Sequence, residues 1–230
     1  MSPDERGKSL QLSDYFIDTG LSKSEVEAIV DIGSPITRER ELIEMGSCVN
    51  CKSIDNRVSV FILIEMLREL QNVSVPYDIY AVFTVQEEVG LRGATAASLN
   101  ITPDFSICLD TTIAFDVPGA KAHEMITKLG AGTAIKIMDS RTICDYRMVR
   151  YMKSVADKHK IKWQVELLPK GGTDTAAMQR EGRSIAGAIS IPTRHIHQVI
   201  EMADRNDIRA SIDLAKACVS ELDQYDWRFQ

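Results

Sequence analysis

The sequence predicts an α/β domain, in which buried strands alternate with amphipathic helices. Short runs of apolar and β-branched residues, such as 79–85 and 185–191, have the length and composition of buried strands. Other segments carry apolar residues at helical spacing, over 58–70, 144–159 and 207–222. Alternation of the two kinds of segment is typical of a sheet with helices packed on its faces.

Composition and charge limit the class of protein. The chain has 230 residues, enough for one good-sized domain or for one domain with part of a second. Its net charge of −6 and the lack of a basic cluster disfavour a nucleic-acid partner. The apolar runs are too short to cross a bilayer, so we expect no membrane partner. An odd number of cysteines and a start without an apolar signal region favour reduced thiols and a cytoplasmic location.

The first 46 residues have little core of their own. Residues 14–20 are predicted as a short strand. Ser22, with Glu25 three residues later, predicts the start of a helix over 23–30. Residues 36–45 are predicted as a further strand pair. The segment therefore has the character of part of a β-rich domain and not of a whole one.

Two motifs precede the first long helix. Cys48 and Cys51 form a C-x-x-C pair, but no second pair or nearby histidine completes a zinc site, and no clear strand precedes it. Incidental spacing is therefore the favoured interpretation of the pair. Asp55 comes just before the helix predicted over 58–70. It is either the N-cap of that helix or a metal ligand at the helix entrance.

Two adjacent carboxylates, Glu87 and Glu88, follow the strand predicted over 79–85. Ligands bind at the carboxyl ends of strands in an open α/β sheet. Two acids at such a place are costly unless a cation faces them. Since sequence neighbours point in different directions, one could bind a metal while the other acts as a general base. The alternative is an ordinary pair of surface glutamates.

Further acids and loops follow the later strands. A strand predicted over 104–109, after a helix over 93–98, also ends in an acid, Asp110. Two neighbouring strands that both end in carboxylates indicate a shared site. Two more strands are predicted over 134–138 and 163–168.

The last strand and the loop before it complete the candidate site. The loop Gly171-Gly172-Thr173-Asp174 lets backbone approach a ligand closely, or is an ordinary turn with Asp174 near a helix start. His195 and His197 follow the strand predicted over 185–191. Residues i and i+2 of an extended chain point to opposite faces, so we expect only one histidine to enter the site.

Together these motifs resemble the deblocking or glutamyl aminopeptidase family, dinuclear-metal aminopeptidases that assemble as tetrahedral dodecamers. The resemblance runs from about residue 14 onward and implies a three-layer α/β/α, zinc-exopeptidase-like catalytic domain over 47–230. Residues 1–46 would be the remnant of an inserted β-rich oligomerisation domain. The matching segments are Ile54-Asp55-Asn56-Arg57-Val58, residues 83–93, residues 109–114, Gly171-Gly172-Thr173-Asp174 and residues 190–197.

The resemblance also implies the role of each residue at the metal site. Asp55 would bridge two divalent metal ions, Glu88 and His197 would complete one site, and Asp110 would belong to the other. Glu87 would be the general base toward a water that the two metals activate. Carboxylate-rich ligation with one histidine per metal suits zinc, cobalt or manganese.

On the substrate side, the resemblance implies that the loop of Gly171, Gly172, Thr173 and Asp174 lines the pocket. His195, at a position usually held by an aromatic residue, would form part of the wall or lie behind the metal ligands. The expected enzyme is a metallo-aminopeptidase, a hydrolase that removes N-terminal residues from peptide substrates. Further copies of the chain are the expected partners, from a dimer up to a dodecamer.

One departure from the family pattern bears on activity. The family supplies a further histidine ligand from a His-x-Asp motif in an N-terminal portion that nothing here matches. We therefore expect weakened metal binding at the site shared by Asp55 and Asp110, and low or absent activity of this chain alone. Two alternatives stay open: an inactive metal-binding fragment or assembly partner of a full-length relative, and a related two-metal amide hydrolase such as a deacylase.

Overall fold

The computed structural model describes residues 11–229, which divide after Arg38 into two units. The first unit holds a 3-10 turn, η2 (Leu12–Asp14), and a short helix, α1 (Lys23–Glu27). The backbone N–H of Ser22 donates to Oε2 of Glu25 at 2.8 Å, which confirms the predicted helix start. No residue from 11 to 38 is buried, so the described part of this unit has no core.

Two predictions for the first 46 residues differ from the structure. The strand predicted over 14–20 is wrong, because no neighbouring strand pairs with it among the described residues. Of the strand pair predicted over 36–45, only β1 (Ile43–Met45) forms, and it pairs with β2 (Cys48–Cys51). This hairpin belongs to the second unit. The predicted boundary at residue 46 between a β-rich remnant and a catalytic domain stays a prediction.

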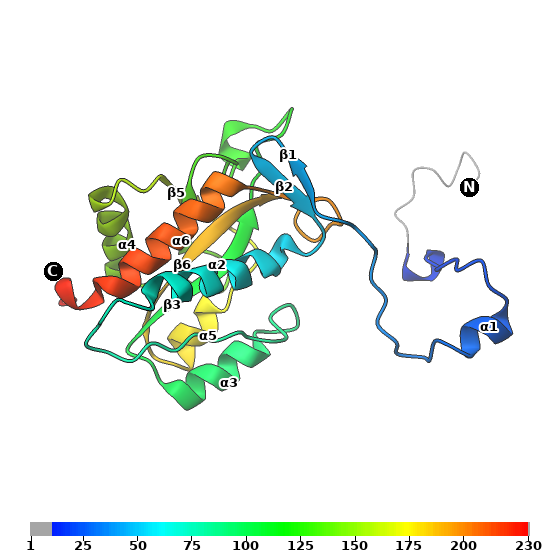
Figure 1. The fold of residues 1–230 in the computed structure, drawn as a ribbon, viewed down its shortest axis with the longest axis horizontal. Helices are drawn as coiled ribbons and strands as arrows, with labels where there is room; N and C mark the ends of the chain where they lie inside the picture. Colours follow the sequence, from blue (N-terminus) through cyan, green and yellow to red (C-terminus); the bar gives the residue numbers. More distant parts are fainter. Residues whose placement is uncertain (1–10, 230) are drawn as a thin grey trace. The chain divides into compact units, whose positions relative to one another are not determined.

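The second unit is built on one seven-stranded mixed sheet (Figure 1). The strand order is β1-β2-β7-β6-β4-β5, and β3 pairs with β6. β3 runs parallel to β6, and β4 runs parallel to β5, while the other pairs are antiparallel. Beyond the β1–β2 hairpin, the strands are β3 (Phe105–Ile113), β4 (Thr133–Met138), β5 (Trp163–Leu167), β6 (Ile185–Arg194) and β7 (Glu201–Asp204).

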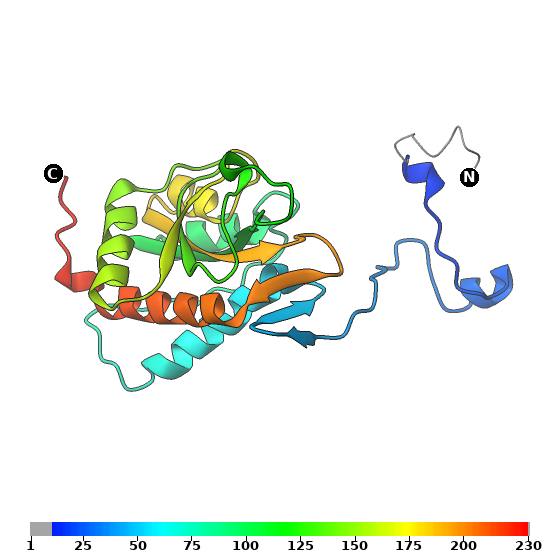
Figure 2. The same cartoon turned by 90° about the horizontal axis from the view of Figure 1, so that it is seen from above.

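Helices cover both faces of the sheet, which confirms the three-layer α/β/α prediction. In Figure 2, α2 and α6 lie on one side of the strands and α5 lies on the other. α3 packs against α5 through the buried residues Leu91, Ala94, Ala176 and Ala177. The helices are α2 (Ile54–Leu70), α3 (Arg92–Ile101), α4 (Tyr146–Lys158), α5 (Thr175–Arg180) and α6 (Arg205–Ser220), with 3-10 turns η3 (Ala122–Glu124) and η4 (Leu222–Gln224).

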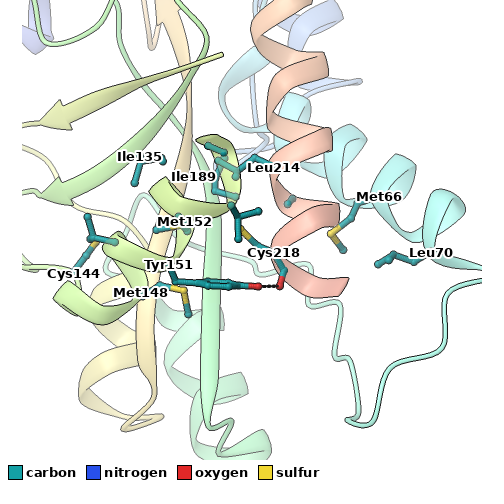
Figure 3. Packing of buried hydrophobic residues seen from close by; sticks show 14 residues of the cluster. Met66, Leu70, Ile135, Cys144, Met148, Tyr151, Met152, Ile189, Leu214 and Cys218 are labelled. Atoms are coloured by element: carbon teal, nitrogen blue, oxygen red, sulfur yellow. Dashed lines mark hydrogen bonds between the residues drawn. The ribbon is translucent and has the colours of Figure 1, made fainter. Parts of the chain in front are cut away.

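The main core lies between the sheet and helices α2, α4 and α6 (Figure 3). Met148 and Met152 of α4 pack on Ile189 of β6, as their helical spacing predicts. Gly187 of β6 allows this close approach, because a Cβ there would lie 2.6 Å from Cγ of Met148. The hydroxyl of Tyr151 donates to the carbonyl of Cys218, which ties α4 to α6 at 2.6 Å.

The strand predicted over 79–85 is wrong. Among the described residues no backbone hydrogen bond joins 79–84 to another segment, and no strand is assigned there. Ile79, Val82, Phe83 and Val85 are each at least 38% exposed. A buried strand needs a neighbour for its main-chain N–H and C=O groups, and an apolar sequence by itself cannot supply one. The helices among residues 11–229 are all too short or too polar to cross a membrane.

Candidate metal centre

Three side chains from distant parts of the sequence converge at one point. Nε2 of His197 lies 3.0 Å from Oδ2 of Asp55 and 3.1 Å from Oε1 of Glu88. The three candidate ligand atoms all lie within 4.8 Å of one another. Asp55 comes from the start of α2, Glu88 from the turn before α3, and His197 from the turn after β6. Two carboxylates and one imidazole so close together are a donor set that fits zinc or a similar divalent ion.

Asp55 does not cap α2. The N-cap residue is Ser53, and Asp55 has φ −75° and ψ 109°, outside the helical range. Its carboxylate faces His197 instead of the free amides of the helix. No helix amide donates to this carboxylate among the described residues, so of the two interpretations of Asp55 the structure favours the metal ligand.

Asp110 lies inside β3 and is more buried than Asp55 and Glu88, with 7% of its surface exposed. Its carboxylate accepts a hydrogen bond from the backbone N–H of Thr111 at 2.8 Å. Burial raises the pKa of Asp110 well above its ordinary value, and the nearby carboxylates of Asp55 and Glu87 raise it further. Asp110 thus belongs to the same electrostatic site, although it is outside the tight group of three.

Glu87 stands beside this group with an unusual proton affinity. Burial raises the pKa of Glu87 to about 7, and the carboxylates of Glu88, Asp174 and Asp55 contribute to the rise. These acids repel one another, and a cation among them would lower the free energy of the ionised state. The electrostatics of this edge of the sheet therefore favour binding of positive charge.

The loop over 171–174 runs next to the same acids. Thr173 and Asp174 are buried, and Oγ1 of Thr84 donates to Oδ2 of Asp174 at 2.6 Å. Oδ1 of Asp174 is buried without a hydrogen-bond partner among the described residues. Asp174 occupies the N-cap position of α5, but its side chain makes no capping bond. Gly171 has φ +78°, a conformation that favours glycine, and a Cβ on Gly172 would lie 2.6 Å from Cδ of Arg141, so a larger residue there would displace the Arg141 side chain.

The two histidines after β6 lie differently. Both histidines are exposed, but the His197 side chain reaches Asp55 and Glu88, whereas the His195 side chain has no hydrogen bond or ion pair with a described residue. The two side chains point differently because the backbone turns here, with φ +59° at His195 and +64° at His197. The alternation of an extended strand, which was the expected cause, does not apply to these two residues. The placement of His195 in a pocket wall stays a prediction.

One residue of the site was missed by the sequence reasoning. Glu201, at the start of β7, is 2% exposed. Its Oε2 accepts the backbone N–H of Asp55 at 2.9 Å, and its Oε1 accepts the backbone N–H of His197 at 2.8 Å. A single glutamate four residues after His197 carries no motif that could have indicated this contact.

The C-x-x-C pair takes no part in the site. Both cysteines are free and lie on β2. Sγ of Cys51 donates to the carbonyl of Arg40 at 3.7 Å, and Sγ of Cys48 donates to Oδ2 of Asp204 at 3.9 Å. The two thiols therefore have separate environments, as expected for residues i and i+3 of a strand.

A three-layer α/β fold with carboxylates and an imidazole gathered beside its sheet is an arrangement that metal-dependent hydrolases use. The chain belongs to the M42 glutamyl aminopeptidase family, whose pattern matches residues 1–214. It is 38% identical over 176 residues to the lysyl aminopeptidase of Pyrococcus furiosus, a match that covers 76% of this chain and 49% of that protein.

Solved structures agree with this assignment. A TET aminopeptidase from a marine sediment thaumarchaeon superposes with a TM-score of 0.90 at 35% identity, over 96% of this chain and 64% of that one. The TET1 peptidase of Pyrococcus horikoshii, which can assemble into a tetrahedron or a large octahedral shell, gives a TM-score of 0.68 at 28% identity, over 85% of this chain and 57% of that one. The chain spans 62% of the length of each of two curated relatives, from Acetivibrio thermocellus and Escherichia coli.

Proposed function

We propose that this chain carries the catalytic portion of a metal-dependent aminopeptidase that removes N-terminal residues from peptides. The observation that carries the proposal is the convergence of Asp55, Glu88 and His197, whose ligand atoms lie within 4.8 Å of one another. Membership of an aminopeptidase family supports the reaction class.

Two divalent ions are proposed at the site, with zinc, cobalt and manganese as the candidates. Asp55, Glu88 and His197 would hold one, and Asp55 with the buried Asp110 would hold the other more weakly. The raised pKa of Asp110 supports the second position, because a cation there would favour the ionised carboxylate, which burial disfavours. When bound, such ions polarise a peptide carbonyl and make water acidic near neutral pH.

Glu87 is proposed as the general base. Its pKa is about 7 in the metal-free chain, and bound cations would lower it toward the ionised form that a base needs to take a proton from the attacking water. Glu87 is next to Glu88 in the sequence and therefore lies beside the proposed ligands, but it is not one of the three residues whose ligand atoms converge.

The acids around the site also favour the free amino terminus of a substrate. Asp174 keeps Oδ1 without a partner among the described residues, and it lies near enough to Glu87 and Asp110 to raise the pKa of each. A protonated amine would find favourable electrostatics there, whereas an acylated terminus would not. We propose that the loop Gly171-Gly172-Thr173-Asp174 and His195 line the pocket that receives the amino terminus of the substrate.

A second candidate is an assembly partner with impaired catalysis. The exposed apolar side chains of 79–85 and the absence of pairing there among described residues favour a surface that another polypeptide covers. We also propose that the chain forms homo-oligomers, from a dimer up to a dodecamer. The exposed apolar side chains of 79–85 and the assembly of the TET1 peptidase support this proposal. The cytoplasmic location stays a prediction.

The test measures metal content per chain by elemental analysis, together with hydrolysis of aminoacyl p-nitroanilides with added cobalt or zinc. Close to two ions per chain, and turnover that Glu87→Gln abolishes, are the results expected of an active aminopeptidase. One ion or none without turnover would support the assembly partner. Faster hydrolysis of N-acylated substrates than of free amines would support the deacylase alternative.

A further inference from the structure

We propose that Glu201 is a positioning residue of the metal centre, which fixes Asp55 and His197 through their main-chain amides. The inference rests on the proposed function, because it assigns a role toward the metal that those two residues would hold. The geometry that carries it is a single buried carboxylate with one oxygen on each amide, at 2.9 Å from Asp55 N and 2.8 Å from His197 N.

The carboxylate of Glu201 is itself held in place. Glu201 pairs with Cys51 in the antiparallel ladder between β2 and β7. The side-chain amide of Asn50 donates to the carbonyls of Ile200 and Glu201 at 2.8 and 3.1 Å, and Asn50 is buried. The sheet therefore fixes the backbone from which the Glu201 side chain extends.

The two amides that Glu201 accepts come from irregular backbone. His197 has φ +64°, in the left-handed region that glycine favours. Asp55 has ψ 109° at a point where the chain is about to enter the helix, and Ser53 before it has φ +55°. Neither amide is paired by a strand ladder or by the helix, so the carboxylate supplies the hydrogen bonds that hold both turns.

This arrangement joins ligands that are far apart in sequence. Asp55 and His197 are separated by most of the catalytic unit, yet both backbones are tied to one side chain. Groups behind the ligands orient them, and losing such a group costs about 10- to 100-fold in metal affinity. Among the candidate ligands Glu201 accepts the amides of Asp55 and His197 but not that of Glu88, so the effect should be on the positions of Asp55 and His197.

Asp207 offers a matched control. It is fully buried and accepts two backbone N–H groups, from Gly130 to Oδ2 and from Gly132 to Oδ1, both at 2.7 Å. These amides belong to a loop that contributes none of the candidate ligands. Glu201→Gln and Asp207→Asn therefore make the same chemical change, since each replaces one of the two accepting oxygens of a buried carboxylate by an NH2 group. Glu201→Gln makes this change at the metal centre, and Asp207→Asn makes it elsewhere.

The experiment titrates cobalt(II) into the chelator-treated full chain of wild type, Glu201→Gln and Asp207→Asn, and follows the visible absorption of the bound ion. We expect both variants to lose thermal stability, but only Glu201→Gln to lose about 10- to 100-fold in cobalt affinity and to change the absorption spectrum. Glu201→Asp, which keeps the charge but shortens the side chain, should show the same loss if Glu201→Gln does not fold.

The positioning role of Glu201 and the metal centre itself are refuted by different results. Cobalt affinity in a folded Glu201 variant within twofold of wild type, or an equal loss in Asp207→Asn, would refute the positioning role and leave the proposed function intact. Absence of any cobalt spectrum in the wild-type chain would refute the metal centre itself.

Discussion

The ammonium of Lys136 on β4 contacts the carboxylate of Glu166 on β5, and both side chains are fully buried. They lie on the face of the sheet that also carries Thr112, whose hydroxyl donates to the same Glu166 oxygen at 2.7 Å. Nζ of Lys136 is also 3.5 Å from Oδ2 of Asp139, and that oxygen accepts a hydrogen bond from Thr173 of the 171–174 loop at 3.2 Å. A buried cation thus links the sheet to the loop.

We expect Lys136→Met to destabilise the protein by about 3–5 kcal/mol, because it leaves two buried carboxylates without their cation. Burial lowers the pKa of Lys136, but the carboxylates of Glu166 and Asp139 together outweigh burial and raise that pKa above its usual value, so the wild-type side chain is charged. Urea denaturation measures the change.

The matched variant is Lys136→Met combined with Glu166→Gln, which removes one charge of each sign. It should recover part of the lost stability. If Lys136→Met alone lowers the free energy of unfolding by less than about 1 kcal/mol, the role of the buried ion pair is contradicted, because an exposed ion pair contributes that little.

Glu87 should make the chelator-treated chain less stable as the pH rises. The unfolded chain releases this proton near pH 4.3, but the folded chain holds it until about pH 7. Between those values the folded state binds more protons, so the free energy of unfolding falls as the pH rises. Glu87→Gln has no such proton, and we expect it to match wild type at pH 4 and to be more stable than wild type at pH 8.

Urea midpoints of wild type and Glu87→Gln across pH 4 to 8 measure this difference. Addition of zinc or cobalt should reduce it, because a nearby cation lowers the pKa of a carboxylate. A gap between the two proteins that stays constant with pH would exclude the titration of Glu87 as its cause.

Asp145 should contribute stability with the opposite pH dependence. Its carboxylate caps α4 by accepting the backbone N–H of Arg147 at 2.9 Å. The hydrogen bond from the Arg147 side chain holds the pKa of Asp145 below its usual value. The contribution is therefore present above about pH 4 and lost as the pH falls through the lower folded value.

We expect Asp145→Ala to cost about 1 kcal/mol at pH 7, a typical value for a helix cap, and much less near pH 2. Thermal unfolding at the two pH values measures this. Equal losses at both would show that the carboxylate charge is not responsible.

Removal of divalent ions by a chelator should lower the unfolding temperature. A ligand at 100 times its dissociation constant stabilises the folded state by about 2.7 kcal/mol. His197→Ala removes the imidazole that lies 3.0 Å from Asp55, so its unfolding temperature should not respond to chelator. His195→Ala, which changes an exposed histidine two residues away, is the control and should respond as wild type does.

Sequence periodicity by itself determined the parts of the fold that rest on local patterns. The apolar stripe of Met148, Val149, Met152 and Val155 predicted α4, and the β-branched run from Ile185 predicted β6. The motifs around Asp55, Glu88 and His197 identified three residues that the structure brings together. Such signals are readable because each is carried by neighbours in the chain.

Tertiary structure decided what depends on a partner distant in sequence. The apolar run over 79–85 has the composition of a strand but no neighbour to pair with among the described residues, whereas β2 and β7 form because each supplies the other's hydrogen bonds. Glu201 has no motif, and its role is visible only where the turns at Asp55 and His197 bring two amides to its carboxylate. Hydrogen-bond partners that are distant in sequence come together only in the folded arrangement, so a local sequence pattern does not reveal them.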